Sequence, residues 1–222
     1  MVPLGRTFLR RLYNMQLYFP PGSRHCKRPI SSEALKDLLW WATAIASSPR
    51  RSIAAQIRDR VSTWSDAAST KGLGAYYITP SQPYPQTKSI LSIVLPTSPL
   101  HLREHINTKE MRAVEQLLLY WGTGWKGKRV VIHSDNRAVS YGLANATIRG
   151  ASMQVLRRCL LLAAKYDLDL QPEWIPTTNN SLADALSRFD YRRVTDLAPQ
   201  LANPECKLPN LGLRIYNNQD YR

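Results

Sequence analysis

Acidic residues are scarce in this chain. Only 16 of its 222 residues are Asp or Glu, against 30 Lys and Arg, and the net charge is +14. A balance of this kind favours a polyanionic partner, and nucleic acid is the commonest one. Charge alone does not separate such a partner from a basic surface without a specific ligand. The positions of the few carboxylates therefore decide how the charge is interpreted.

Long apolar runs and paired cysteines are also missing. No apolar stretch approaches the roughly 20 residues of a membrane-spanning helix, so we expect no membrane partner. Cys26, Cys159 and Cys206 are odd in number and far apart, and no Cys-x-x-Cys spacing occurs. Neither a disulfide framework nor a zinc site is supported. We expect an intracellular, reducing compartment and predict that Cys159 is a small core residue.

The first part of the chain has no acidic residue before Glu33, but it has six basic ones: Arg6, Arg10, Arg11, Arg24, Lys27 and Arg28. This composition is typical of an organelle transit peptide, which would place the protein in the mitochondrion. It fits a helical segment facing nucleic acid equally well. We favour the second interpretation, and with it the nucleus or the cytoplasm.

The expected elements change from helices to strands near residue 61. Helices are predicted over 6–13 and from a cap at Ser31 or Ser32 to Ile45. Strands and helices then follow in this order: strands 61–65, 73–78 and 89–95, helix 108–121, strand 129–134, helix 151–165, strand 168–175 and helix 180–188. This order predicts an α/β fold, with an antiparallel meander and parallel strands in one mixed sheet flanked by helices. We divide the chain into a basic helical segment 1–60, an α/β domain 61–190 and an extended tail 191–222.

Four carboxylates fall where a metal-dependent nuclease would hold cations. Asp66 and Asp135 each end an apolar strand, while Glu110 and Asp184 lie early in helices. Strand ends hold ligands rigidly, and Mg²⁺ prefers oxygen ligands. Two such ions roughly 4 Å apart supply an activated water and compensate the charge that develops in phosphodiester hydrolysis. The sequence therefore predicts a site for divalent cations.

Glu110 and Asp184 also have a simpler explanation. An acidic residue in the first turn of a helix interacts favourably with the helix dipole, and this is common. Glu110 lies on the apolar stripe of its helix, where an unpaired carboxylate is costly. For Glu110 alone the two explanations stay open. The order of all four acids along the chain favours a shared site.

The four acids lie in a series of short motifs: Ser65-Asp-Ala-Ala-Ser69, Gly72-Leu-Gly-Ala75, His105-Ile-Asn-Thr-Lys-Glu110, His133-Ser-Asp-Asn136 and Trp174-Ile-Pro-Thr-Thr-Asn-Asn-Ser-Leu-Ala-Asp-Ala-Leu-Ser-Arg188. These motifs resemble the ribonuclease H domain of retroelement reverse transcriptases, most closely that of DIRS-type elements. The resemblance spans about residues 61–190, and residues 2–12 and 37–41 resemble the thumb or connection segment that precedes this domain.

The resemblance implies a ribonuclease H-like fold and hydrolysis of the RNA strand of an RNA–DNA hybrid. It also implies a catalytic set of metal ligands for two Mg²⁺ ions, with Mn²⁺ as a substitute: Asp66, Glu110, Asp135 and Asp184. Asn107, Asn136 and Arg188 could contact the sugar or phosphate of the nucleic acid, although each also has an ordinary surface role as its alternative. Because no Tyr-x-Asp-Asp motif occurs, no DNA synthesis is expected, and a polymerase or ribonucleoprotein is a further candidate partner.

The chain departs from the family pattern in two places. Thr177 stands where the family usually has Gly after Ile-Pro. No residue matches the late catalytic histidine of cellular ribonucleases H, since His101, His105 and His133 all precede the last strand. We therefore expect modest turnover, or water in place of the histidine.

Three other functions compete with this one. The chain could be an inactive ribonuclease H-like module that binds nucleic acid or takes part in ribonucleoprotein assembly. A transposase or integrase nuclease would place its essential Glu after the second Asp, whereas Glu110 precedes Asp135. A proofreading-type exonuclease would need Asp-x-Glu on the first strand, where Ala68 occupies the third position. The intact set of four acids argues against the inactive module.

Overall fold

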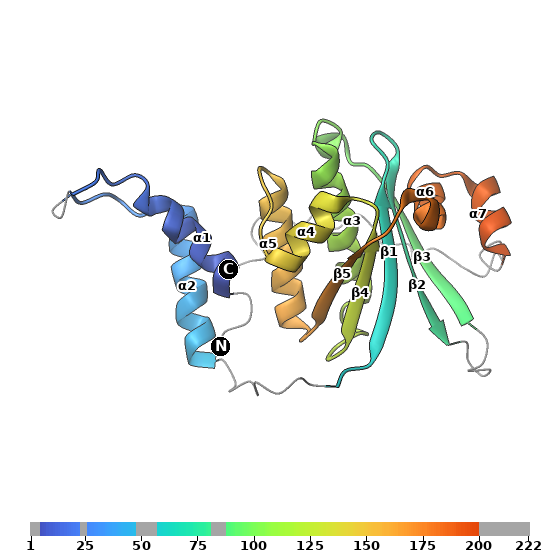
Figure 1. Ribbon diagram of the computed structural model, residues 1–222, viewed down its shortest axis with the longest axis horizontal. Helices are drawn as coiled ribbons and strands as arrows, with labels where there is room; N and C mark the ends of the chain where they lie inside the picture. Colours follow the sequence, from blue (N-terminus) through green and yellow to red (C-terminus); the bar gives the residue numbers. More distant parts are fainter. Residues whose placement is uncertain (1–4, 23–25, 48–56, 81–87, 200–222) are drawn as a thin grey trace.

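The computed structural model describes residues 5–22, 26–47, 57–80 and 88–199. It contains one five-stranded sheet, helices on both of its faces and a pair of helices at one side (Figure 1). In chain order the elements are α1 (Gly5–Gln16), α2 (Ser32–Ser47), β1 (Arg60–Ala67), β2 (Gly72–Pro80), β3 (Lys88–Pro96), η1 (Pro99–His101), α3 (Ile106–Trp121), β4 (Arg129–Ser134), α4 (Arg137–Asn145), α5 (Ser152–Lys165), β5 (Asp169–Trp174), η2 (Thr177–Asn180), α6 (Ser181–Ser187) and α7 (Tyr191–Leu197).

The sheet combines two modes of strand pairing. Its strand order is β3-β2-β1-β4-β5, with β1, β2 and β3 antiparallel and with β4 parallel to both β1 and β5. This confirms the predicted α/β mixed sheet, with its meander and parallel strands, and it is the ribonuclease H-like arrangement that the resemblance implied. Because β1 and β4 are parallel neighbours, their carboxyl ends meet at the same edge of the sheet.

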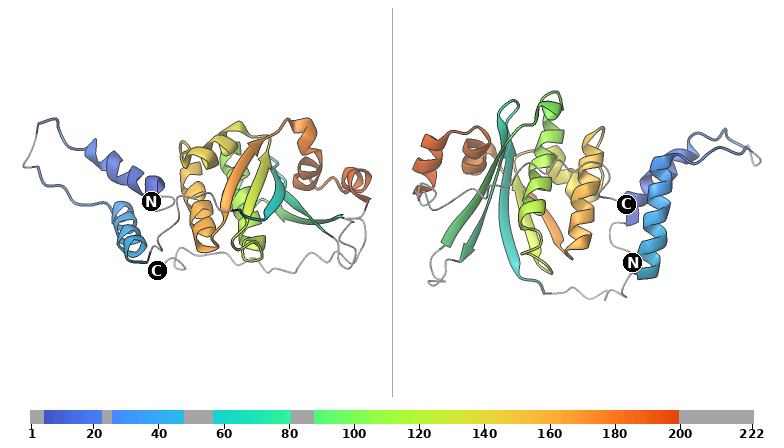
Figure 2. Two further views of the ribbon diagram at one scale, coloured as in Figure 1. Left: turned by 60° about the horizontal axis from the view of Figure 1, so that its bottom comes forward. Right: turned by 180° about the vertical axis from the view of Figure 1, so that it is seen from behind.

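The main core lies between one face of the sheet and helices α3 and α5 (Figures 1 and 2). The apolar stripe predicted for α3 is buried there: Met111, Val114, Leu117 and Leu118 are fully buried, and Trp121 is partly buried. Cys159 is fully buried in this core, as predicted. This packing fixes α3 against the sheet and so determines which side chains of α3 reach the sheet edge.

Helix α6 covers part of the opposite face and packs on β2 and β1. Its approach depends on Gly74, because a Cβ there would lie 2.7 Å from the Ala183 carbonyl oxygen and 2.5 Å from the Ser187 nitrogen. Real Cβ atoms do not approach backbone atoms so closely. Gly74 is paired with Asp66 across the meander, so the close approach brings α6 beside the end of β1.

Two helices are absent from the sequence-based expectation. Helix α4 was not predicted; its N-cap is Asn136, whose Oδ1 accepts hydrogen bonds from the Ala138 nitrogen (3.0 Å) and the Val139 nitrogen (3.2 Å). The tail was predicted to be extended from residue 191, and this was wrong for α7. There the Asp190 side chain accepts a hydrogen bond from the Arg193 nitrogen, and Val194 is buried. Residues 200–222 of the expected tail lie outside the described residues.

Helices α1 and α2 pack on each other and then on the α/β domain. Phe8 and Trp40 stack with ring centroids 3.9 Å apart, and Ser31 caps α2 by accepting a hydrogen bond from the Ala34 nitrogen (3.2 Å). No helix in the described part of the chain is long and apolar enough to cross a bilayer. The segment limits at residues 60 and 190 stay predictions.

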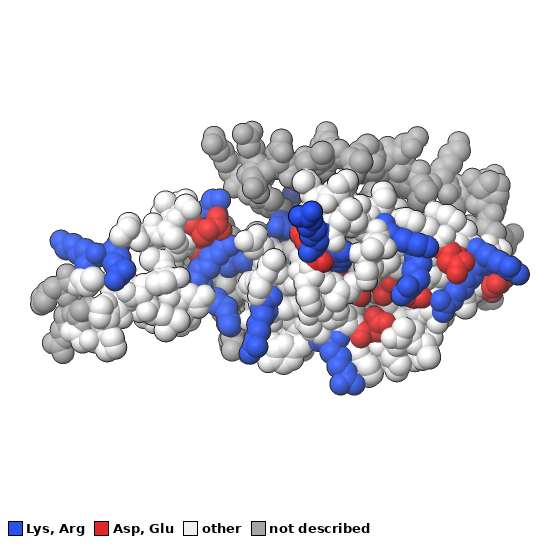
Figure 3. Space-filling model, turned by 90° about the horizontal axis from the view of Figure 1, so that it is seen from above, with Lys and Arg blue, Asp and Glu red and all other residues white. Residues whose placement is uncertain are grey.

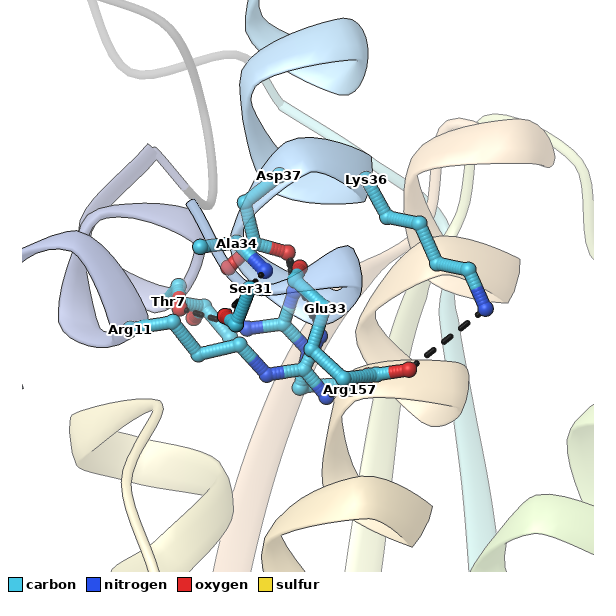
Figure 4. A network of polar contacts seen from close by, with 8 residues as sticks. All are labelled: Thr7, Arg11, Ser31, Glu33, Ala34, Lys36, Asp37 and Arg157. Atoms are coloured by element: carbon cyan, nitrogen blue, oxygen red, sulfur yellow. Dashed lines mark hydrogen bonds and ion pairs between the residues drawn. The ribbon is translucent and has the colours of Figure 1, made fainter. Parts of the chain in front are cut away.

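Arg157 of α5 is the main polar link to these two helices (Figure 4). Its guanidinium donates to the Thr7 carbonyl oxygen (2.9 Å), forms a buried ion pair with Asp37 and lies 4.5 Å from the centroid of the Phe8 ring. Arg11 approaches Asp37 from α1 (3.5 Å). One buried cation therefore holds both N-terminal helices.

We predict that Arg157→Met lowers the free energy of unfolding by about 3 kcal/mol, because removing one partner leaves a buried carboxylate without adequate compensation. Urea unfolding measures the loss. The control is Lys36→Met, since Lys36 and Glu33 form an exposed ion pair (3.4 Å) that should contribute less than about 0.5 kcal/mol. Equal losses in the two variants would contradict the role assigned to Arg157.

Candidate metal centre

Three carboxylates from separate elements converge where β1 and β4 end. Asp66 lies near the end of β1, Asp135 directly follows β4, and Glu110 comes from α3. Each offers a carboxylate oxygen, and these oxygens lie within 4.8 Å of one another. The parallel pairing of β1 with β4 and the packing of α3 on β1 bring them together. A cation at this place would be surrounded by oxygen ligands.

Glu110 is the most constrained member of the group. It is only 5% exposed, and its Oε2 has no hydrogen-bond partner among the described residues. Burial raises the pKa of Glu110 well above its usual range; the charges of Asp66 and Asp135 add to this, and a hydrogen bond from the Ala67 backbone opposes it. Helix α3 begins at Ile106, so Glu110 lies beyond the first turn. The helix-dipole explanation for Glu110 is therefore excluded.

Asp66 is buried beside α6. Ser187 Oγ donates a hydrogen bond to Asp66 Oδ2 (2.5 Å) and also lies 2.9 Å from the Asp184 carbonyl oxygen. Burial is the main cause that raises the pKa of Asp66 to about 6; the hydrogen bond from Ser187 opposes the rise, and the nearby Asp135 and Asp184 add to it. Without a cation, ionising this group is costly.

The backbone around Asp135 is held from two sides. Trp174 Nε1 donates to the Asp135 carbonyl oxygen (2.9 Å), and the Asn136 nitrogen donates to Ser134 Oγ (3.1 Å). The Trp174 side chain is 44% exposed, and the Arg137 guanidinium lies 4.6 Å from its ring centroid. The end of β5 thus fixes the loop that carries the third carboxylate.

Asp184, the predicted fourth ligand, lies close to the other three but is not part of their group. Its Oδ1 accepts from Arg188 Nε (2.6 Å) and its Oδ2 from Arg193 Nη1 (3.0 Å). The structure thus assembles three of the four predicted ligands, and the role of Asp184 at the metal stays a prediction.

The residues predicted to touch nucleic acid have contacts within the protein. Asn136 Nδ2 donates to Asn107 Oδ1 (3.0 Å), and the Asn107 nitrogen donates to His105 Nδ1 (3.2 Å). Arg188 pairs with Asp184. These contacts order the surface beside the carboxylates, and nucleic-acid contact by Asn107, Asn136 and Arg188 stays a prediction.

Sequence reasoning missed three residues near the site: Ser187, Trp174 and Arg193. Ser187 lies one turn after Asp184 on α6, so helical spacing could have placed both on one face. Trp174 reaches Asp135 only through the pairing of β5 with β4, and Arg193 reaches Asp184 only through the fold of α7. No local sequence pattern predicts either contact.

Of the comparisons with known proteins, only the comparison with solved structures found similar proteins. No family model and no curated protein matches the sequence. Similar structures include ribonuclease H1 from the halophilic archaeon Halobacterium salinarum NRC-1, with 16% identity, coverage of 63% of this chain and 99% of that chain, and a TM-score of 0.44. LC11-RNase H1 in complex with RNA/DNA hybrid has 16% identity, coverage of 57% and 92%, and a TM-score of 0.38. The foamy viral protease-reverse transcriptase in complex with RNA/DNA hybrid has 14% identity, coverage of 72% and 26%, and a TM-score of 0.38.

The raised pKa of Asp66 predicts how the stability of metal-free protein depends on pH. A carboxyl whose folded-state pKa is raised stabilises the fold at low pH, and this contribution is lost as the pH rises through the folded-state value of about 6. Between pH 4 and pH 7 in chelator, the wild type should therefore lose about 3 kcal/mol relative to Asp66→Asn. Urea unfolding at each pH measures the difference.

Asp169→Asn is the matched control, because Asp169 is only half-buried and pairs with Arg129 at 2.8 Å away from the three carboxylates. Because Asp169→Asn keeps Asp66, its stability should fall between pH 4 and pH 7 as that of the wild type does. Parallel curves for the wild type and Asp66→Asn would contradict the account of the buried carboxylate.

Proposed function

We propose that this protein is a metal-dependent endonuclease of the ribonuclease H type that hydrolyses the RNA strand of RNA–DNA hybrids and derives from a retroelement reverse transcriptase. The observation that carries the proposal is Glu110, a buried carboxyl group that has one oxygen without a hydrogen-bond partner among the described residues and that lies beside Asp66 and Asp135. Such a group is costly unless a cation compensates it. The family resemblance of the surrounding motifs supplies the reaction.

The ligand set fits a hard divalent cation. Asp66, Glu110 and Asp135 offer only carboxylate oxygens, which suit Mg²⁺ and also Mn²⁺. When bound there, two ions would activate a water molecule and compensate charge on the phosphate and the leaving oxygen. Ser187 and Trp174 position the side chain of Asp66 and the backbone of Asp135. We include Asp184 as the ligand through which the second ion is held.

The substrate part of the proposal rests on charge and on the resemblance. Hybrid duplexes are recognised by shape, phosphates and 2′-hydroxyl groups more than by base edges. Figure 3 shows Lys and Arg side chains around the acidic groups on the face where β1 ends. LC11-RNase H1 and the foamy viral enzyme were both solved in complex with RNA/DNA hybrid. We propose the same class of ligand here, with Asn107, Asn136 and Arg188 beside the cleaved strand.

The histidines have contacts elsewhere in the described structure. His133 stacks on Trp64 and pairs with Glu173 (3.3 Å). His101 contacts Glu104 (3.2 Å), and His105 caps α3. We therefore propose that water carries protons to and from the reacting groups, at the cost of turnover rate. An intracellular setting in the nucleus or cytoplasm, or in the mitochondrion, and a polymerase or ribonucleoprotein partner belong to the same proposal.

The decisive assay compares the wild type with Asp135→Asn on an RNA–DNA hybrid, single-stranded RNA and duplex DNA, with Mg²⁺ or Mn²⁺. We expect the wild type to cut RNA only in the hybrid, and Asp135→Asn to lose at least about 100-fold in rate, because one cation ligand is weakened. Asp169→Asn makes the same chemical change at an acid outside the group and should keep full activity.

A second candidate function has its own support. Asp184 is engaged by two arginines and no histidine joins the carboxylates in the described residues, and both features favour an inactive ribonuclease H-like module that binds nucleic acid or assembles a ribonucleoprotein. Hybrid binding without cleavage by wild type and variant alike would favour this function over the nuclease.

Binding to the hybrid should depend steeply on salt. With a net charge of +14, several Lys and Arg side chains would displace counterions from the phosphates, so affinity should fall at least about tenfold between 50 and 200 mM salt. Fluorescence anisotropy of a labelled hybrid, with Ca²⁺ in place of Mg²⁺ to prevent cleavage, measures the slope. Binding that is flat over this range would contradict a phosphate-based grip.

A further inference from the structure

Asp184 differs from the other three acids because both of its oxygens are neutralised. Arg188, the C-cap residue of α6, lies four residues after Asp184 and binds Oδ1, while Arg193 comes from α7 and binds Oδ2. The Asp184 side chain is only 13% exposed, whereas those of Arg188 and Arg193 are 58% and 46% exposed. The carboxylate has one cation on each oxygen.

The other three carboxylates show the opposite pattern. Among the described residues, none of Asp66, Glu110 and Asp135 forms an ion pair, although their oxygens lie within 4.8 Å of one another. Their mutual repulsion favours binding of a cation. The negative charge of these three carboxyl groups is therefore not compensated by the protein, whereas that of Asp184 is already compensated by two arginines.

The fold sets the position of the Arg193 backbone. The turn between α6 and α7 places Phe189 in the left-handed region (φ 58°), and the Asp190 nitrogen donates to the Ala185 carbonyl oxygen (3.0 Å). Val194 is buried in the cluster that α6 forms with β2. Helix α7 therefore carries Arg193 to Asp184 as part of a packed structure, while the Arg193 side chain itself stays 46% exposed and able to turn away.

We propose that Arg193 competes with the second divalent cation for Asp184. The first cation binds Asp66, Glu110 and Asp135 without displacing any protein group. The second binds through Asp184 only after the guanidinium of Arg193 has left Oδ2. This rests on the proposed metal centre and adds that occupancy of the second position is set by a contact from α7.

The size of the effect follows from the exposure of the pair. Ion pairs with a partly exposed partner contribute modestly to free energy, so removing Arg193 should tighten binding of the second ion by about threefold to fivefold. Arg188 remains on Oδ1 and continues to orient the carboxylate. Loss of Arg193 should leave the affinity for the first ion nearly unchanged.

The experiment is a titration of the full chain with Mn²⁺ alone, in which the electron paramagnetic resonance signal of the free ion gives the number of bound ions and their affinities. We compare the wild type, Arg193→Ala and the control Arg192→Ala. Arg192 is the exposed neighbour on α7, so the control makes the same change in net charge without touching Asp184. Circular dichroism checks that all variants are folded.

Arg193→Ala should bind the second Mn²⁺ about threefold to fivefold more tightly than Arg192→Ala, and this gain should vanish when both variants also carry Asp184→Asn. Equal second-ion affinity in the two variants, weaker binding in Arg193→Ala or a gain that survives Asp184→Asn would overturn the competition. A wild type that binds no Mn²⁺ at all would instead overturn the metal centre on which the proposed function rests.

Discussion

The arrangement of this protein depends on one unfavourable interaction, the burial of the Glu110 carboxylate against Asp66 and Asp135. Removing a carboxylate from water without a partner is costly, and two further acids nearby increase that cost. The parallel pairing of β1 with β4 and the packing of α3 on β1 maintain this arrangement. Three ionised carboxylates held so close repel one another, so the fold is destabilised unless a proton or a cation compensates their charge. Because either a proton or a cation can compensate this charge, the pH dependence of stability is linked to the proposed metal chemistry.

The rest of the site is built around these carboxylates by contacts far apart in sequence. Gly74 allows α6 to approach the sheet, and α6 in turn places Ser187 on Asp66. From the other side, β5 brings Trp174 to the Asp135 carbonyl oxygen. Each contact fixes the position of one functional group through a neighbouring element, as a preorganised site requires.

Much of the architecture could be predicted because it has local signals. Strand 129–134 and the three strands of the meander follow from apolar runs bounded by turn residues, and the stripe on α3 has helical spacing. The start of α3 was placed two residues late, since His105 is an uncommon cap and its ring nitrogen accepts from the Asn107 nitrogen only in the folded loop. Helix α7 was missed because it buries a single apolar side chain, Val194, and so shows no stripe.

The candidate site could be predicted as far as the order of the acidic motifs along the chain indicates which residues meet. Asp66, Glu110 and Asp135 converge as expected, because two of them end adjacent strands and the third lies on the helix packed against β1. The state of Asp184 could not be predicted, since one of its two partners comes from an element without a sequence signal. Long-range contacts that depend on a turn in the left-handed region, as at Phe189, leave no periodic trace in the sequence.

The most direct test of the central claim is the affinity of wild type and Glu110→Gln for Mn²⁺, measured by titration calorimetry at pH 7.5. Glutamine keeps the shape of the side chain but removes the negative charge that a bound cation would compensate. We predict that the wild type binds Mn²⁺ with release of protons, and that Glu110→Gln binds at least about tenfold more weakly and releases fewer protons. Equal affinity and equal proton release in the two proteins would contradict the claim that the buried carboxylate is compensated by a metal ion.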